Sequence, residues 1–135
     1  MASKRVLGIG LDPHTIDFNG DFLRGKSLTV ESIIAGTNAE TARLRSMGYD
    51  FDWLLLDARG TPEAAAEAAK IELASRPVEV VIIGGGIRLD PARTPMLEAL
   101  VNAVGQAAHG AKLAFNTSPT ETVQAIERVA RTNPG

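Results

Sequence analysis

The stretch from Val78 to Pro91, VEVVIIGGGIRLDP, constrains the fold of this chain more than any other. Residues 80–83 are an unbroken run of β-branched side chains, which a strand tolerates when both of its faces are buried. Gly84, Gly85 and Gly86 follow, and glycine lets a backbone approach a ligand closely or adopt positive φ. The stretch therefore predicts a central parallel strand whose end opens onto a candidate site.

Strand-like and helix-like patterns alternate four times along the chain. The other strand-like segments are 5–11, 51–57 and 112–116, and helical patterns cover 28–47, 61–75, 94–110 and 119–131. This alternation predicts one α/β domain over residues 1–135, a three-layer α/β/α sandwich with a parallel sheet of about four strands. Right-handed crossovers leave few topologies, and we expect the flavodoxin-like, Rossmann-like strand order 2-1-3-4. This order puts the two glycine-containing strands, the first and the third, at the centre.

Capping residues and glycines mark the predicted helix ends. Thr61-Pro62 and Thr94-Pro95 each combine an N-cap residue with proline at the first helical position. Ser118–Glu121 has the pattern of a capping box, and it predicts a last helix that begins there. Gly48 and Gly110 are expected to end the first and third helices.

Two features of the first strand and its exit are informative. Gly8 and Gly10 interrupt that strand, which indicates that another element packs closely on it. Residues 15–27 show neither a helical nor a strand period, so we expect a loop that is long enough to cover another part of the fold. A lid is one interpretation of this loop.

Composition excludes several classes of protein. Apolar residues make up 44% of the chain and charged residues 22%, and no apolar run approaches the ~20 residues of a membrane span. The short apolar run near the N-terminus meets Asp12 and Pro13 and fails as a signal peptide, so we expect cytoplasmic residence. The chain has no cysteine, which excludes disulfides and thiolate chemistry. A net charge of -2 offers no basic surface for nucleic acid.

Polar residues follow all four predicted strands. In an open parallel sheet, ligands bind beyond the carboxyl ends of the strands, at the point where the strand order reverses. Three predicted helices begin just beyond these ends and direct N–H groups toward the same rim. We therefore expect a small anionic molecule, bearing phosphate or carboxylate, to bind there. The ligand-binding candidates are Gly84, Gly85, Gly86, Arg88, Asn116, Thr117 and Ser118.

Asp57, His14 and Asp12 are the candidates for acid/base catalysis, because carboxylates and imidazole transfer protons near neutral pH. Each has a structural alternative. Asp12 precedes Pro13 and suits a turn, His14 suits a solvated loop, and Asp57 can form a turn or cap toward Thr61. Both interpretations stay open at this point.

Arg88 also has two interpretations: it can clamp a carboxylate or phosphate, or it can pair with Asp90 on the surface. The glycines are not a dinucleotide fingerprint, because Pro13 stands where the third glycine of Gly8-x-Gly10 belongs. No phosphate-binding lysine motif, metal-ligand spacing or serine-hydrolase elbow is present, so the sequence assigns no metal and no cofactor.

The segments IGLDP (9–13), IGGGIRLDP (83–91) and FNTSPTET (115–122) resemble a group of small uncharacterised bacterial and fungal flavodoxin-like proteins. That resemblance implies a shared fold and site and brings no activity with it. Asp12, Asp57 and Thr117 or Ser118 also resemble the phosphoryl site of response-regulator receiver domains. Of that family's paired acids only Asp12 is present, and its lysine after a fifth strand has no counterpart.

Two functions follow as hypotheses. The first is a small protein that binds an anionic molecule, with acid/base catalysis as an added option. The alternative is a non-catalytic, receiver-like regulatory or protein-interaction module, whose partner is another protein or a second copy of the chain. A structural subunit is a third option, because small α/β folds host many unrelated functions.

Overall fold

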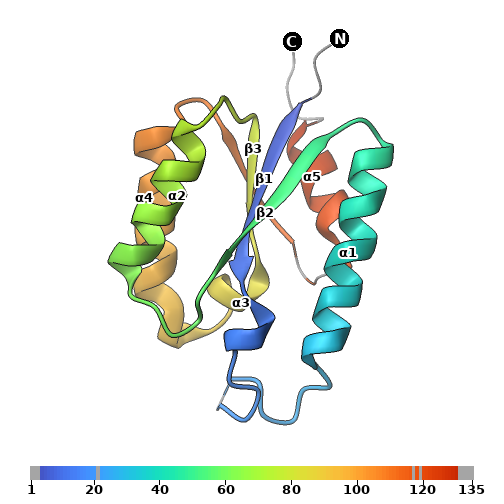
Figure 1. Cartoon of the computed structure of the whole chain (residues 1–135), viewed down its shortest axis with the longest axis vertical. Coiled ribbons are helices and arrows are strands. Elements are labelled where there is room, and N and C mark those ends of the chain that lie inside the picture. The colour runs from blue at the N-terminus through green and yellow to red at the C-terminus, as the bar shows by residue number, and fades with distance from the viewer. Residues whose placement is uncertain (1–3, 21, 117, 119, 131–135) are drawn as a thin grey trace.

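The computed structural model describes residues 4–20, 22–116, 118 and 120–130. The strands are β1 (Arg5–Leu11), β2 (Asp50–Leu56), β3 (Val80–Ile83) and β4 (Lys112–Phe115). They form one sheet of order β2-β1-β3-β4, in which every neighbouring pair is parallel. The predicted α/β class and the order 2-1-3-4 are confirmed (Figure 1).

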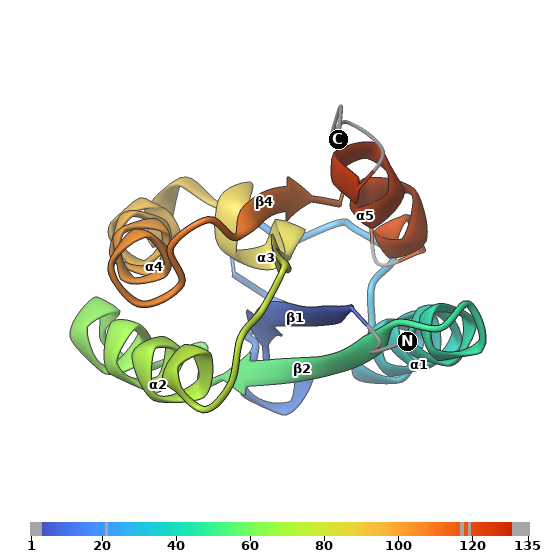
Figure 2. The same ribbon diagram turned by 90° about the horizontal axis from the view of Figure 1, so that it is seen from above.

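Helices cover both faces of this sheet, which makes the molecule a three-layer sandwich. They are α1 (Val30–Ser46), α2 (Pro62–Ala74), α3 (Gly85–Arg88), α4 (Thr94–Ala107) and α5 (Thr122–Ala130), with short 3-10 helices η1 (Pro13–Thr15) and η2 (Pro91–Arg93). Figure 2 shows α2 and α4 on one side of the sheet and α1 and α5 on the other. Within the described ranges, no helix has the length and apolar character needed to cross a bilayer.

Alternating side chains of the central strands fill the two cores. Leu7 and Ile9 of β1 face α2 and α4 and pack with Leu100, all of them at most 1% exposed. Val6 and Ile82 face α1 and α5 in the second cluster. Because side chains alternate between the faces of a strand, the run of β-branched residues in β3 supplies both cores at once.

The close approach predicted for Gly8 and Gly10 is confirmed, and the element involved is the neighbouring strand. Gly8 pairs in register with Trp53 of β2, and the indole ring lies over β1. A Cβ atom added to Gly8 would lie 2.5 Å from Cε3 of Trp53. The Trp53 indole N–H donates to Thr41 Oγ1 of α1 at 3.1 Å, so the ring also joins β2 to the helix layer.

Several predicted helix ends need correction. Gly48 and Gly110 do end α1 and α4 with positive φ, as expected. Residues 85–88, however, form the one-turn helix α3, which the glycine pattern did not predict. Thr94 makes no side-chain cap, because η2 precedes it directly and Arg93 occupies the N-cap position.

The last helix begins later than predicted. We expected it to start with a capping box at Ser118–Glu121, but α5 begins at Thr122. The carboxylate of Glu40 from α1 instead accepts a hydrogen bond from the Val123 N–H at 3.2 Å. A side chain from another helix therefore provides a hydrogen-bond acceptor for the first turn of α5.

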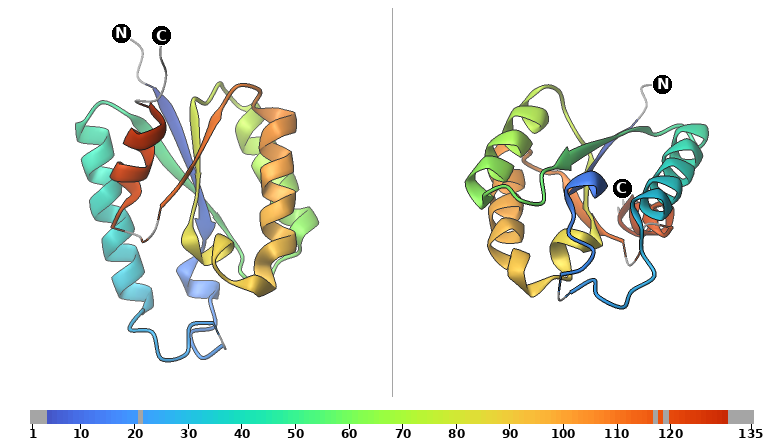
Figure 3. Two further views of the ribbon diagram at one scale, coloured as in Figure 1. Left: turned by 180° about the vertical axis from the view of Figure 1, so that it is seen from behind. Right: turned by 60° about the horizontal axis from the view of Figure 1, so that its bottom comes forward.

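The segment between η1 and α1 crosses the carboxyl ends of the strands, as Figure 3 shows. It contains most of residues 15–27, for which the sequence predicted a covering loop. This position makes the segment one wall of the site described next.

Candidate functional site

The carboxyl end of β1 is tied to that of β2 by a network centred on Asp12 and Thr15. The Asp12 N–H donates to Leu56 O at 2.7 Å, and the Thr15 hydroxyl donates to Asp12 O at 2.7 Å. Thr15 Oγ1 in turn accepts from the Ala58 N–H at 2.8 Å. These contacts hold η1 at the rim, where the predicted catalytic residues lie.

Asp12 and His14 form a contact pair within η1. Asp12 Oδ1 accepts from the His14 N–H at 3.0 Å and lies 3.1 Å from His14 Nδ1. This arrangement caps the turn, as the structural alternative expected, and it also orients the imidazole. A neutral His14 ring with its proton on Nδ1 leaves Nε2 available as a base on a side chain that is 69% exposed.

Asp57 is held by Arg59 rather than by the Asp12 and His14 pair. Arg59 Nε lies 3.0 Å from Asp57 Oδ1, Nη2 lies 3.3 Å from Oδ2, and the Arg59 N–H donates to Oδ1 at 2.8 Å. The hydrogen bonds from the Arg59 side chain lower the pKa of Asp57. Both Asp57 and the nearby Asp12 raise the pKa of Arg59. Asp57 is therefore an ionised neighbour at the rim and a poor proton donor.

Arg88 uses its guanidinium to join the ends of β3 and β4. Its Nε donates to Ile83 O at 2.9 Å and its Nη2 donates to Asn116 O. The guanidinium carbon also lies 5.0 Å from the centre of the Phe115 ring, and partial burial lowers the pKa of Arg88. Asp90 instead faces Arg93, so the surface pair that we considered for Arg88 is made by another arginine.

The remaining ligand-binding candidates are spread along the same rim. Asn116 is 4% exposed, and its amide nitrogen donates to Thr122 Oγ1 at 3.2 Å. Its Oδ1 is the one buried side-chain oxygen or nitrogen without a hydrogen-bond partner in the part of the chain that the structure describes. The Ser118 hydroxyl lies 3.1 Å from Thr120 Oγ1, and Thr117 lies outside the described residues.

Gly84, Gly85 and Gly86 do not use positive φ, so they do not exercise the conformational freedom that we considered for them. Gly84 N–H donates to Ile9 O at 2.9 Å, which extends the β1–β3 pairing to the strand end. Gly86 lies on the exposed side of α3, where it borders a cavity.

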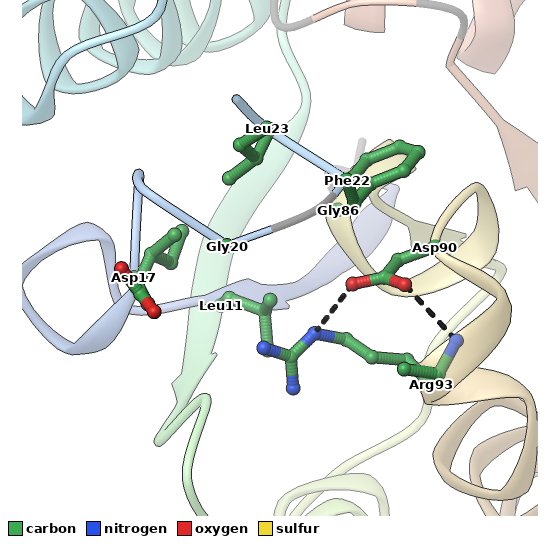
Figure 4. A pocket seen from close by; sticks show the side chains of 10 residues that line it. Leu11, Asp17, Gly20, Phe22, Leu23, Gly86, Asp90 and Arg93 are labelled. Carbon is green, nitrogen blue, oxygen red and sulfur yellow. Dashed lines mark hydrogen bonds and ion pairs between the residues drawn. The ribbon is translucent and has the colours of Figure 1, made fainter. Parts of the chain in front are cut away.

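That cavity, which we call the edge cavity, has a volume of about 270 Å³. It lies at the carboxyl edge of the sheet, beside β1 and β3, where the strand order reverses. Its lining residues are Leu11, Ile16, Asp17, Gly20, Phe22, Leu23, Gly86, Asp90, Ala92 and Arg93 (Figure 4). Half of them come from the segment that follows η1, so this segment does cover a cavity.

Arg93 is the one cation among the described residues that line the edge cavity. Its side chain is 22% exposed, its Nη1 donates to Ala58 O at 2.7 Å, and its Nε lies 3.8 Å from Asp90 Oδ2. The distance to Asp90 is too long for a hydrogen bond, so most of the guanidinium N–H groups have no acceptor among the described residues. Figure 4 shows Asp90 above the Arg93 side chain, which extends beneath Leu11.

Sequence reasoning missed Arg93, Phe22 and Leu23 as site residues. The available signal was the predicted covering loop together with the segment DPAR at 90–93, which is an aspartate turn leading into a helix. Nothing in that pattern shows that Arg93 reaches Ala58 at the end of β2.

A second cavity, of about 320 Å³, lies at the opposite, amino-terminal edge of the sheet and is lined in part by Lys4, Glu79 and Lys112. Ligands of open parallel sheets bind at the carboxyl edge, so the edge cavity is the stronger candidate. In the described part of the chain, no group of three or more His, Asp or Glu residues is placed to hold a metal ion.

No protein-family model, no curated protein and no solved structure matches this chain. The resemblances to the small flavodoxin-like group and to receiver domains therefore stay predictions. The assignment of the site rests on the geometry of this molecule alone.

Proposed function

We propose that this chain is a cytoplasmic protein that binds a small anionic molecule in the edge cavity. The proposal rests on the environment of Arg93, whose largely covered guanidinium makes one hydrogen bond and one long ion pair. A carboxylate or phosphate oxygen is the acceptor that such a group binds best, since its donors match those oxygens in pairs.

Three further features support this location. The cavity lies at the reversal of strand order, where ligands of this architecture bind. Gly86 brings backbone without a side chain to its wall, and Leu11, Phe22 and Leu23 supply apolar surface. A few polar groups within apolar walls are typical of small-molecule sites.

The proposal includes acid/base catalysis as an option, and His14 is the residue that would transfer the proton. Leu11 and Ile16, which flank η1 in sequence, both line the cavity, so His14 lies in the turn between two of its walls. Asp12 orients the ring of this largely exposed side chain, and Nε2 is the atom that would accept a proton. Asp57 then acts as a fixed negative charge.

A ligand screen followed by calorimetry tests the proposal. Small carboxylates, inorganic phosphate and sugar phosphates are added to the wild-type protein, and a ligand at a hundred times its Kd should add about 2.7 kcal/mol of stability. Arg93→Gln should abolish the response of the best ligand. The matched control is Arg59→Gln, an arginine on the same rim that is 74% exposed and does not line the cavity.

Ala92→Trp is a second variant, which adds a bulky side chain to the lining of the cavity without removing a polar contact. It should also abolish binding. Full affinity in both Arg93→Gln and Ala92→Trp, or no stabilisation of the wild-type protein by any of these anions, would show that the proposal is wrong.

A further inference from the structure

The charges that line the edge cavity are of both signs. Among the described residues that line it, the charged ones are Asp17, Asp90 and Arg93. A dianionic phosphate beside two carboxylates meets repulsion that a single guanidinium does not offset, because charges of like sign interact strongly at partly covered sites. The set is complementary to a ligand that carries one negative and one positive group.

The carboxylates of Asp90 and Asp17 differ in their exposure and in how many of their oxygen atoms already have a partner. Asp90 is 19% exposed, accepts from the Ala92 N–H at 3.0 Å and lies beside Arg93. Asp17 is exposed, and its Oδ1 accepts from the Asn19 N–H at 2.9 Å. Its Oδ2 accepts no hydrogen bond from a described residue. Asp17 is thus the acceptor available to a positive group of a ligand.

The rest of the lining selects an apolar body. Leu11 is 9% exposed, and Ile16, Phe22 and Leu23 are half-buried around the cavity. These side chains have no hydrogen bond to offer, so the part of the ligand that contacts them is apolar. The volume of about 270 Å³ is below the ~300–1,000 Å³ of sites for drug-sized ligands, which indicates a compact molecule.

We propose that the ligand of the edge cavity is a zwitterionic α-amino acid with an apolar side chain. Its carboxylate binds Arg93, its ammonium group binds Asp17, and its side chain packs against Leu11, Phe22 and Leu23. This inference rests on the proposed function, because it names the class of carboxylate-bearing molecule that the same cavity takes.

Calorimetry with paired ligands tests it. L-leucine is compared with isocaproate, and L-phenylalanine with hydrocinnamate, because each acid keeps the carboxylate and the apolar body and lacks the ammonium group. The wild-type protein should bind each amino acid roughly tenfold or more tighter than its partner, the contribution of one hydrogen bond between charged groups.

Asp17→Asn separates the ammonium contact from the rest of the site. Asparagine keeps the Oδ1 that accepts from Asn19, so the local turn is retained while the charge is removed. This variant should bind amino acid and deaminated acid with equal affinity. The control is Asp52→Asn on β2, whose side chain is 59% exposed and does not line the cavity.

The outcomes separate this inference from the proposed function. If isocaproate or phosphate binds the wild-type protein as tightly as leucine does, or if Asp17→Asn keeps the preference, the zwitterion is wrong while anion binding at Arg93 stands. If neither the amino acids nor any of these anions binds, both proposals are wrong.

Discussion

Gly8 and Trp53 pair in register on neighbouring strands, and the indole ring occupies the space that a side chain at Gly8 would need. The added Cβ of Gly8→Ala would lie 2.5 Å from Cε3 of a ring that Thr41 also holds through a hydrogen bond. We expect Gly8→Ala to lower the free energy of unfolding by about 1–3 kcal/mol, the usual cost of overpacking. Denaturant unfolding measures the loss, and the emission of Trp53, the single tryptophan, reports the displaced ring.

Gly105→Ala is the matched control for this prediction. Gly105 lies in α4 with nothing within 4 Å of an added Cβ, so alanine should raise stability by up to about 1 kcal/mol. Equal stabilities of the two variants would show that the Trp53 ring does not pack against Gly8 of β1.

Glu40 supports α5 from a distance. Its carboxylate is buried, at 7% exposure, and accepts from the Val123 N–H. Glu40→Ala leaves that buried donor unpaired and should destabilise the protein by about 1–3 kcal/mol in chemical denaturation. Glu40→Gln keeps an acceptor and loses only the favourable charge at a helix N-terminus, so its effect should be smaller. Glu67→Ala, at an exposed position of α2, should stay within about 0.5 kcal/mol, and a similar loss there would contradict the assignment.

Arg88 contributes to stability whatever its role toward ligands. Arg88→Met removes the two hydrogen bonds to Ile83 O and Asn116 O and should cost at least about 1.5–3 kcal/mol, the range for a single bond to a charged group. Arg88→Lys should recover only part of the loss, because one ammonium group does not reproduce the planar fork. Thermal unfolding compared with Arg43→Met, an exposed arginine of α1, checks this, and equal melting temperatures would refute it.

Acid should weaken the contact between Asp50 and Arg76. The hydrogen bond from Arg76 lowers the pKa of Asp50 in the folded protein. A carboxylate with a lowered folded pKa stabilises the protein fully above its unfolded value of about 3.9, and this contribution is lost as the pH falls toward the folded value. The stability difference between the wild-type protein and Asp50→Asn should therefore be constant near neutral pH and shrink below about pH 4.

Arg76→Gln breaks the ion pair between Asp50 and Arg76 from the arginine side. In urea titrations over this pH range, Asp50→Asn should have a smaller effect on pH dependence in the Arg76→Gln background, where only the charges of Arg5 and Arg45 still lower the pKa of Asp50. A pH-independent difference between the wild-type protein and Asp50→Asn would mean that the pair does not form in solution.

Local patterns predicted much of the architecture. The β-branched run before Gly84 predicted that β3 lies at the centre, because a strand covered on both faces tolerates such a run, and Gly8 and Gly10 predicted that β1 lies beside it. The same glycines indicated a close neighbour without identifying it. Trp53 became that neighbour through the register of β1 with β2, which no local pattern contains.

The candidate site was predicted only in outline. The carboxyl edge and the covering segment followed from strand order and from the loop at 15–27. For Arg88 the sequence left a ligand clamp and a surface pair with Asp90 open, and the structure shows it donating to two strand ends, whereas Arg93 lines the edge cavity. Both arginines follow the same strand, and their roles depend on which carbonyl groups lie within reach.

The sequence by itself determined the α/β class, the parallel sheet and the central strands, and it predicted the edge at which we propose that a ligand binds. These properties depend on local periodicity and burial, which each segment carries alone. Only the tertiary structure decided the contact of Trp53 with Gly8, the support of α5 by Glu40 from 83 residues away, and the contact of Arg93 with Ala58. Such contacts join segments whose separation is set by how the helices pack on the sheet, so they exist only once the layers are assembled.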